Sequence, residues 1–196
     1  MQIHYDFTKN RKYVTTTLEM YKPDEYGATF WFADFDYNDN IESKSISLAY
    51  WEIARYLTIP SKTNLSASIQ YNDGVMAGVG GLGSIWLTGL SYSTNYSGFN
   101  LSSDLLFRKK GGNNGYQLTF VWFRTLLQNK LVISGYFDYW VSRFDSINDY
   151  VVLTEPQIWY NINNRLMVGS EIEISKNFLQ SEDIKIYPTI AFKWTF

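Results

Sequence analysis

The stretch IKIYPTIAFKWTF at residues 184–196 decides the fold, because its side chains alternate between two faces. One face carries Ile184, Ile186, Pro188, Ile190, Phe192, Trp194 and Phe196. The opposite face carries Lys185, Tyr187, Thr189, Lys193 and Thr195. A period of two is typical of a β-strand. A strand of this length can cross a membrane, which takes about 9 to 11 residues, whereas strands of soluble sheets have about 5 to 6.

The same alternation extends back through the chain, most clearly in residues 65–72, 99–108 and 166–175. We predict strands at residues 2–8, 13–22, 28–38, 43–57, 65–73, 84–93, 99–108, 116–127, 131–142, 149–160, 165–176 and 184–196. An even number of strands is typical of bacterial outer-membrane barrels, and the first of the twelve is required mainly by this even count.

The connections between these strands alternate in length along the chain. One set is compact and comprises residues 22–27, 59–64, 94–98, 128–130 and 161–165. The other set includes the longest connections, at residues 74–83, 109–115, 142–148 and 176–183. Bacterial barrels show this asymmetry, with the short turns on the periplasmic side. Together with aromatic residues near the strand ends, it predicts an all-β, 12-stranded antiparallel up-and-down transmembrane β-barrel. A soluble up-and-down barrel or sandwich is the alternative.

The amino-acid composition limits the classes of protein to which the chain can belong. The chain has 196 residues, which we interpret as a single domain spanning residues 1–196. Its 17 basic and 19 acidic residues leave a net charge of −2, without the basic patch that nucleic-acid binding requires. The absence of cysteine excludes thiolate chemistry and suits an oxidising compartment. No apolar run reaches the roughly 18 residues of a membrane-spanning helix. The first residues lack a signal-peptide pattern, so we interpret Met1 as an initiator placed on a mature sequence.

Four segments resemble the Tsx-like family of outer-membrane channels, in particular a branch of small barrels from gut anaerobes. They are FWFADFDYN at residues 30–38, SLAYWEIARYL at 47–57, LTEPQIWYN at 153–161 and PTIAFKWTF at 188–196. The resemblance implies a monomeric barrel in the outer membrane of a Gram-negative bacterium, with nucleosides as the substrate class. Phe196 also resembles the C-terminal signature that the outer-membrane assembly machinery reads. Expected partners are therefore that machinery, membrane lipid, lipopolysaccharide and a small polar solute.

If lipid contacts the apolar face, the polar face lines the lumen and carries the function. The candidate lumen and substrate-binding residues are Asp34, Asp36, Trp51, Glu52, Arg55, Asp138, Trp140, Glu155, Glu171, Glu173, Lys185, Tyr187 and Lys193. Within this set, Trp51, Glu52 and Arg55 cannot all point inward without a bulge. Glu19, Asp104, Arg108, Tyr136 and Gln157 are further inward candidates. The excess of carboxylates favours neutral or cationic solutes over anions.

Two interpretations of these side chains remain open. In one, charges and aromatic rings form a selective track in which the rings stack on a planar base. In the other, the charges are salt-bridged struts that fill the barrel and close it. Pro156 predicts a bulge or bend in its strand, because proline cannot donate to the ladder. The glycine-rich segment 74–83 is either a plug at the mouth or a surface loop.

Enzymatic function is not expected. Small barrel hydrolases need a histidine positioned by a carboxylate or paired with a serine, and His4 is the only histidine of the chain. A GxSxG motif is missing, and we expect neither a metal nor a cofactor. The sequence therefore predicts a narrow channel for small polar solutes. The alternative is a barrel with a closed lumen that acts as a structural or partner-binding protein.

Overall fold

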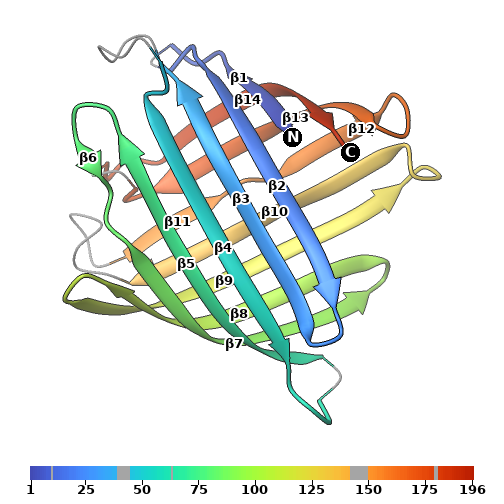
Figure 1. Ribbon diagram of the computed structural model, residues 1–196. Coiled ribbons are helices and arrows are strands. Elements are labelled where there is room, and N and C mark those ends of the chain that lie inside the picture. Colours follow the sequence, from blue (N-terminus) through green and yellow to red (C-terminus); the bar gives the residue numbers. More distant parts are fainter. Residues whose placement is uncertain (10, 39–44, 63, 142–149, 179–180) are drawn as a thin grey trace.

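The computed structural model describes residues 1–9, 11–38, 45–62, 64–141, 150–178 and 181–196 (Figure 1). Its strands are β1 (Gln2–Asp6), β2 (Val14–Asp24), β3 (Gly27–Tyr37), β4 (Leu48–Thr58), β5 (Leu65–Met76), β6 (Gly80–Gly81), β7 (Ile85–Tyr96), β8 (Phe99–Lys110), β9 (Asn113–Leu126), β10 (Leu131–Val141), β11 (Tyr150–Thr154), β12 (Gln157–Asn161), β13 (Leu166–Lys176) and β14 (Lys185–Trp194). All pairings are antiparallel, and β1 pairs with β14, so that the sheet closes into a barrel.

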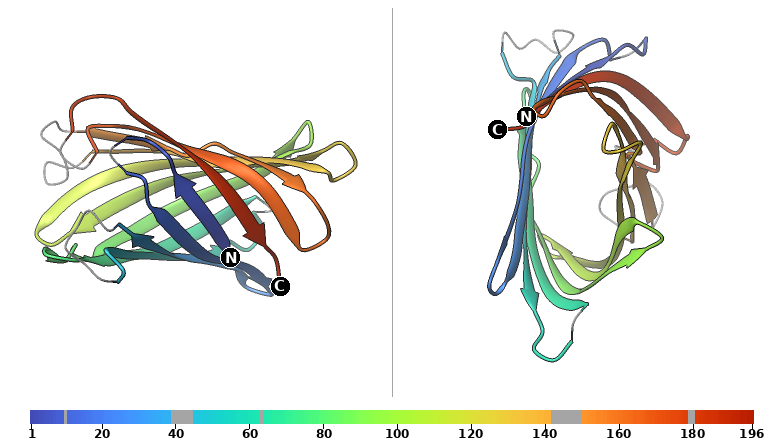
Figure 2. Two further views of the ribbon diagram at one scale, coloured as in Figure 1. Left: turned by 90° about the horizontal axis from the view of Figure 1, so that it is seen from above. Right: turned by 90° about the vertical axis from the view of Figure 1, so that its right-hand side faces the viewer.

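The described strands form a barrel of twelve, as the sequence predicts. Of the fourteen strands, β6 lies off the main path, and β11 and β12 are two halves of one barrel strand between β10 and β13. The right-hand view of Figure 2 shows a closed wall with an elongated cross-section. Among the described residues, none belongs to a helix long and apolar enough to span a membrane.

The two ends of the barrel differ in their connections. Both chain ends lie side by side at one end, where the backbone N–H of Trp194 donates to the carbonyl of Met1 (Figure 2). The described connecting residues at this short-turn end are 25–26, 59–62, 64, 97–98, 127–130 and 162–165. Those at the opposite end, the loop end, are residues 7–9, 11–13, 38, 45–47, 77–84, 111–112, 177–178 and 181–184. The predicted connection 142–148 and the predicted strand start at 43–44 lie outside the described residues.

One predicted loop is wrong. Residues 109–115 were expected to form one of the longer connections, but β8 and β9 pair as far as Lys110 and Asn113. Only Gly111 and Gly112 remain for the turn, and Gly111 has a φ of 57°. Two-residue hairpin loops need positive φ values, which glycine adopts without steric cost. The glycine pair therefore shortens the loop, because it permits a tight hairpin.

The glycine-rich segment 74–83 divides into two parts. Its first residues continue β5 as far as Met76, and β6 then folds back to pair with the end of β5. The side chain of Leu82 lies over Gly74, where an added Cβ would come within 2.8 Å of Leu82 Cδ1 and 3.2 Å of the Tyr50 ring. This short hairpin therefore packs against the end of the wall at the loop end.

Pro156 interrupts the ladder without shifting it. Phe137 pairs with Thr154 before the interruption, and Ser134 pairs with Gln157 after it, which is the same register. A bulge would insert a residue and change this register, so of the two predicted alternatives the bulge is wrong, while the bend stays a prediction. Opposite Pro156, an added Cβ on Gly135 would come within 2.9 Å of Pro156 Cα. Proline lacks the backbone N–H that the ladder needs, which contributes to the break between β11 and β12.

The two faces of the wall are chemically distinct. On β1, Gln2, His4 and Asp6 are buried, whereas Ile3 and Tyr5 are exposed on the outside. The same division holds around the barrel, and the exposed large hydrophobic residues include Leu57, Ile69, Leu90, Leu105, Ile158, Ile186, Ile190 and Phe192. Side chains alternate across a sheet, so the alternation of the sequence becomes an apolar outer surface around a largely polar interior.

Candidate functional site in the barrel lumen

The strand register determines which predicted lumen residues point inward, because residues paired across adjacent strands share a face. Starting from the buried Gln2, His4 and Asp6 of β1, the inner face can be followed around the closed barrel. It includes Asp34, Asp36, Glu52, Asp138, Trp140, Glu155, Glu171, Glu173, Lys185, Tyr187 and Lys193.

Trp51 and Arg55 lie on the outer face, contrary to the prediction. Strand β4 keeps one unbroken register with both β3 and β5, so Glu52 points inward and its odd-numbered neighbours point outward. Arg55 Nη1 lies 2.6 Å from Asp24 Oδ2 and 3.0 Å from Thr29 Oγ1 near the short-turn end. The ion pair with Asp24 explains how Arg55, a charged residue on the same strand as Glu52, can lie on the outer face.

Five inward carboxylates form what we call the acidic ring: Asp34 on β3, Glu52 on β4, Asp138 on β10, Glu155 between β11 and β12, and Glu171 on β13. Each of the five residues is half-buried. An inward side chain can be exposed only to the lumen, so side chains do not fill the interior completely at this level. The negative charges also act on one another across the barrel, Glu52 with Asp138 and Asp34, and Asp34 with Glu155 and Glu171.

The acidic ring is held by neutral donors. Thr17 donates to Asp34 at 2.6 Å, Thr119 to Asp138 at 2.5 Å and Gln157 to Glu171 at 2.5 Å. Glu52 accepts from the Tyr50 hydroxyl at 2.5 Å and from Asn72 Nδ2 at 2.7 Å, and Glu155 bonds to Tyr136. Among the described residues, no lysine or arginine lies within 4.0 Å of a ring carboxylate. The ring is therefore positioned by hydrogen bonds, without an ion pair to a lysine or arginine of the described residues.

Other inward carboxylates are paired with cations. Lys193 forms an ion pair with Glu19, which joins β14 to β2 across the inner side of β1. Arg11 lies 2.8 Å from Glu173 and 3.6 Å from Asp6, and its guanidinium covers the Tyr187 ring at 3.6 Å. Burial would lower the pKa of Arg11, but the hydrogen bond and charge of Glu173 raise it. These pairs link distant segments of the wall.

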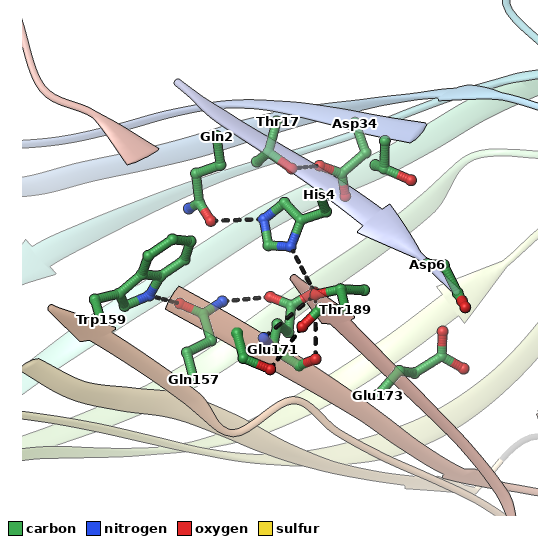
Figure 3. A network of polar contacts seen from close by, with 12 residues as sticks. Gln2, His4, Asp6, Thr17, Asp34, Gln157, Trp159, Glu171, Glu173 and Thr189 are labelled. Atoms are coloured by element: carbon green, nitrogen blue, oxygen red, sulfur yellow. Dashed lines mark hydrogen bonds and ion pairs between the residues drawn. The ribbon is translucent and has the colours of Figure 1, made fainter. Parts of the chain in front are cut away.

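His4 belongs to a network of wall contacts (Figure 3). Its Nε2 lies 2.8 Å from Gln2 Oε1, and its Nδ1 lies 3.2 Å from Thr189 Oγ1 and 3.8 Å from Glu171. The ring meets Trp159 edge-on at 5.9 Å. In the described part of the chain, no group of three or more histidine, aspartate or glutamate side chains is arranged to hold a metal. The contacts of His4 are thus those of a residue that helps to close the barrel.

The lumen also contains residues that the sequence interpretation did not select. Tyr50 and Tyr56 share the face of Glu52, so the parity of β4 could have indicated them once Glu52 was placed inward. Asp104, one of the inward candidates named from the sequence, is only 2% exposed and accepts from Tyr56 at 3.2 Å and Gln70 at 3.1 Å. Tyr56 reaches it across two intervening strands, β5 and β7, in agreement with the elongated cross-section. Such contacts depend on barrel shape, which the sequence does not specify.

The whole chain, residues 1–196, matches the model of a protein family described as "Domain of unknown function (DUF5020)". The chain belongs to the DUF5020 family. Its match is to this family, so the resemblance to Tsx-like channels is not confirmed. Among curated proteins, none matches the DUF5020 chain.

Solved structures share the fold of this DUF5020 barrel at low sequence identity. A NanC porin superimposes with a TM-score of 0.66 at 7% identity, covering 100% of this chain and 98% of the porin. A KdgM porin gives a TM-score of 0.60 at 11% identity, covering 100% and 99%. The KdgM porin in complex with disordered oligogalacturonate gives 0.59 at 11% identity, covering 100% and 99%. The DUF5020 barrel therefore has the closed antiparallel fold of these small porins.

Proposed function

We propose that this protein is a narrow channel of a Gram-negative outer membrane, through which small polar solutes diffuse. The observation that carries the proposal is the acidic ring, whose five half-buried residues face the lumen. A barrel built only as a support would fill this level with apolar side chains or ion pairs. The fold shared with two porins supports the same function.

The outer surface supports the membrane location. Long strands of 11 residues, such as β2, β3 and β4, match the roughly 9 to 11 residues that a tilted strand needs to cross a bilayer. Large apolar side chains are exposed along them, and Leu105 on β8 is 63% exposed. Exposed apolar area of this extent is costly in water and favourable in lipid. We therefore propose lipid and lipopolysaccharide as the contacts of this surface.

The charge of the lumen favours neutral and cationic solutes, because the ring carboxylates repel anions. This preference differs from that expected of a porin that holds oligogalacturonate, the acidic ligand present in the KdgM complex. Nucleosides are the solute class that the Tsx-like resemblance suggests. Inward rings at the level of the acidic ring, Phe32 and Tyr50 with centroids 6.1 Å apart, would offer faces for stacking on a base.

We propose that the barrel is a monomer and that Phe196, 92% exposed at the short-turn end, is read by the outer-membrane assembly machinery. Deleting Phe196 should lower the amount of folded barrel in the outer membrane of an expressing bacterium. Refolding of the purified variant into detergent should be unchanged. A variant that fails equally in both settings would show that Phe196 serves stability instead of assembly.

Conductance of the refolded protein in a planar bilayer tests the channel proposal. We expect discrete openings that nucleosides block at micromolar to millimolar concentration, with the block altered in the double variant Asp34→Ala/Asp36→Ala. A heat-resistant inserted barrel without openings would favour the alternative of a closed barrel that acts through partners. A specific observation favours that alternative, since part of the lumen is filled by almost fully buried side chains. These inward residues are Leu87, Leu106, Trp140 and Val151.

A further inference from the structure

The side chain of Asn72, which points inward, has a hydrogen-bond acceptor without a donor among the described residues. Asn72 on β5 is only 6% exposed, and its Nδ2 donates to Glu52 Oε1 at 2.7 Å and to the Tyr50 hydroxyl at 3.2 Å. The Oδ1 atom of the same amide is buried without a hydrogen-bond partner among the described residues. A buried acceptor without a donor costs about 1 to 3 kcal/mol. The amide thus adds an unmet acceptor beside an uncompensated carboxylate.

The whole environment of Glu52 is rich in acceptors and poor in donors. Both hydrogen bonds to its carboxylate end on Oε1, so Oε2 stays available to a ligand. Asp138 and Asp34 add negative charge from other strands, and Arg108 on β8 contributes the opposing positive charge on this side. The Arg108 guanidinium lies over the Trp140 ring at 5.5 Å. A ligand that brings N–H donors and positive charge would satisfy this cluster.

The geometry disfavours a divalent metal as that ligand. A metal ion needs several carboxylates that converge on one point, and no such group is present in the described residues. The ring carboxylates instead come from β3, β4, β10, β13 and the junction of β11 and β12, spread around the lumen. Separated negative charges suit a flexible chain that carries separated positive charges. An alkylammonium group also has three N–H donors, enough for Glu52 Oε2 and for Asn72 Oδ1 once the amide turns this buried oxygen toward the ligand.

We propose that the acidic ring binds the ammonium groups of linear di- and polyamines, with Glu52, Asn72 and Tyr50 forming one subsite. The inference rests on the proposed channel function, since it names a solute class for the same lumen. Aromatic faces next to the carboxylates, Phe32 beside Asp34 and Tyr136 beside Asp138, would contact the methylene chain or the cation. The subsite therefore selects solutes by charge number and by spacing.

Spermidine binding to the detergent-refolded barrel, measured by isothermal titration calorimetry at about 50 mM salt, tests the proposal without requiring an open pore. We expect Glu52→Gln to weaken binding about tenfold, because a charge-assisted hydrogen bond is lost while the Tyr50 and Asn72 contacts can persist. Asn72→Leu should weaken binding to a smaller extent. The matched control is Glu19→Gln, an inward carboxylate already paired with Lys193, which should change binding less than twofold.

A comparison of amines that carry one or two ammonium groups distinguishes binding at the subsite from general electrostatic attraction to the lumen. Putrescine should bind more tightly than butylamine, which has the same carbon chain with one ammonium group. Equal effects of Glu52→Gln and Glu19→Gln, or undetectable spermidine binding to the wild type, would overturn the proposal. Polyamine binding without conductance would refute the channel and leave the site standing. Conductance that spermidine does not alter, together with absent binding, would refute the site and leave the channel standing.

Discussion

Two groups of carboxylates share the inner face of the barrel, and they differ in how their charge is balanced. Glu19 and Glu173 are paired with Lys193 and Arg11, which belong to segments far away in the sequence. The acidic ring accepts hydrogen bonds from threonine, tyrosine, asparagine and glutamine, without a cation in ion-pair contact among the described residues. The paired carboxylates join strands to one another, whereas the ring carboxylates are directed at the lumen.

We use this difference to distinguish carboxylates that stabilise the fold from carboxylates to which we assign a function. An ion pair in a wall adds little net attraction for a passing solute, because its two charges cancel at a distance. Five carboxylates gathered around a narrow lumen lower stability, and we therefore attribute to them a role other than folding. The comparison thus predicts that variants of the ring change selectivity, and that variants of the pairs change stability.

Neutralising the ring should give the largest effect. The triple variant Glu52→Gln/Asp138→Asn/Glu155→Gln removes three of five ring charges while each amide keeps the shape of the carboxylate. We expect the cation-to-anion permeability ratio to fall about tenfold, because the fixed field that concentrates cations in the lumen is mostly lost. The reversal potential of a planar bilayer in a KCl gradient measures this ratio. A ratio unchanged within twofold would assign selectivity to another part of the barrel.

Breaking a wall pair should change stability instead. Lys193→Met leaves Glu19 without its cation at the closure between β14 and β2, where the two side chains are 23% and 30% exposed. We expect the free energy of unfolding to fall by about 1 kcal/mol, because partly exposed pairs contribute little. Urea unfolding in lipid vesicles, followed by tryptophan fluorescence, measures the change. The double variant Glu19→Gln/Lys193→Met should recover part of the loss, and a double variant as unstable as the single one would contradict the pairing.

Salt should reduce the selectivity of the wild type by a smaller factor. The Debye length is about 10 Å at 0.1 M and about 3 Å at 1 M, so the ring charges are screened from a solute at the centre of the lumen. We expect the cation-to-anion ratio to fall about threefold between these concentrations. The triple variant should show almost no salt dependence. Salt dependence of equal size in both proteins would place the selective charges outside the ring.

The sequence predicts the barrel well because alternation is a local signal. Residues of β14 and β1 alternate between the outside and the lumen regardless of what pairs with them, so the strands and their two faces can be predicted from the local pattern. The ion pairs are a different matter, since Lys193 and Glu19 are separated by 174 residues and Arg11 and Glu173 by 162. Only closure of the barrel brings these groups together. Which of the inward carboxylates form ion pairs and which belong to the acidic ring therefore cannot be predicted from the sequence.

The local pattern does not predict which side chains of β4 point inward, because Trp51, Glu52 and Arg55 are all chemically suited to a lumen. An unbroken register with both neighbours leaves one parity inside, and Glu52 takes it with Tyr50 and Tyr56. The pair with Asp24 stabilises Arg55 on the outer face near the short turns, where both side chains are partly exposed. Sequence alone gives no reason to prefer that placement, because Asp24 lies on another strand.

Replacing Arg55 should therefore give the smallest effect. Arg55→Gln removes an outer ion pair that is exposed and screened, and it leaves the lumen untouched. We expect the cation-to-anion ratio and the spermidine affinity to stay within experimental error of the wild type, with little change in the unfolding midpoint. The inward control Glu52→Gln, three positions away on the same strand, should change both readouts. If Arg55→Gln made the pore more cation-selective while Glu52→Gln had no effect, β4 would have to be turned by one residue, because a single-residue shift exchanges its two faces.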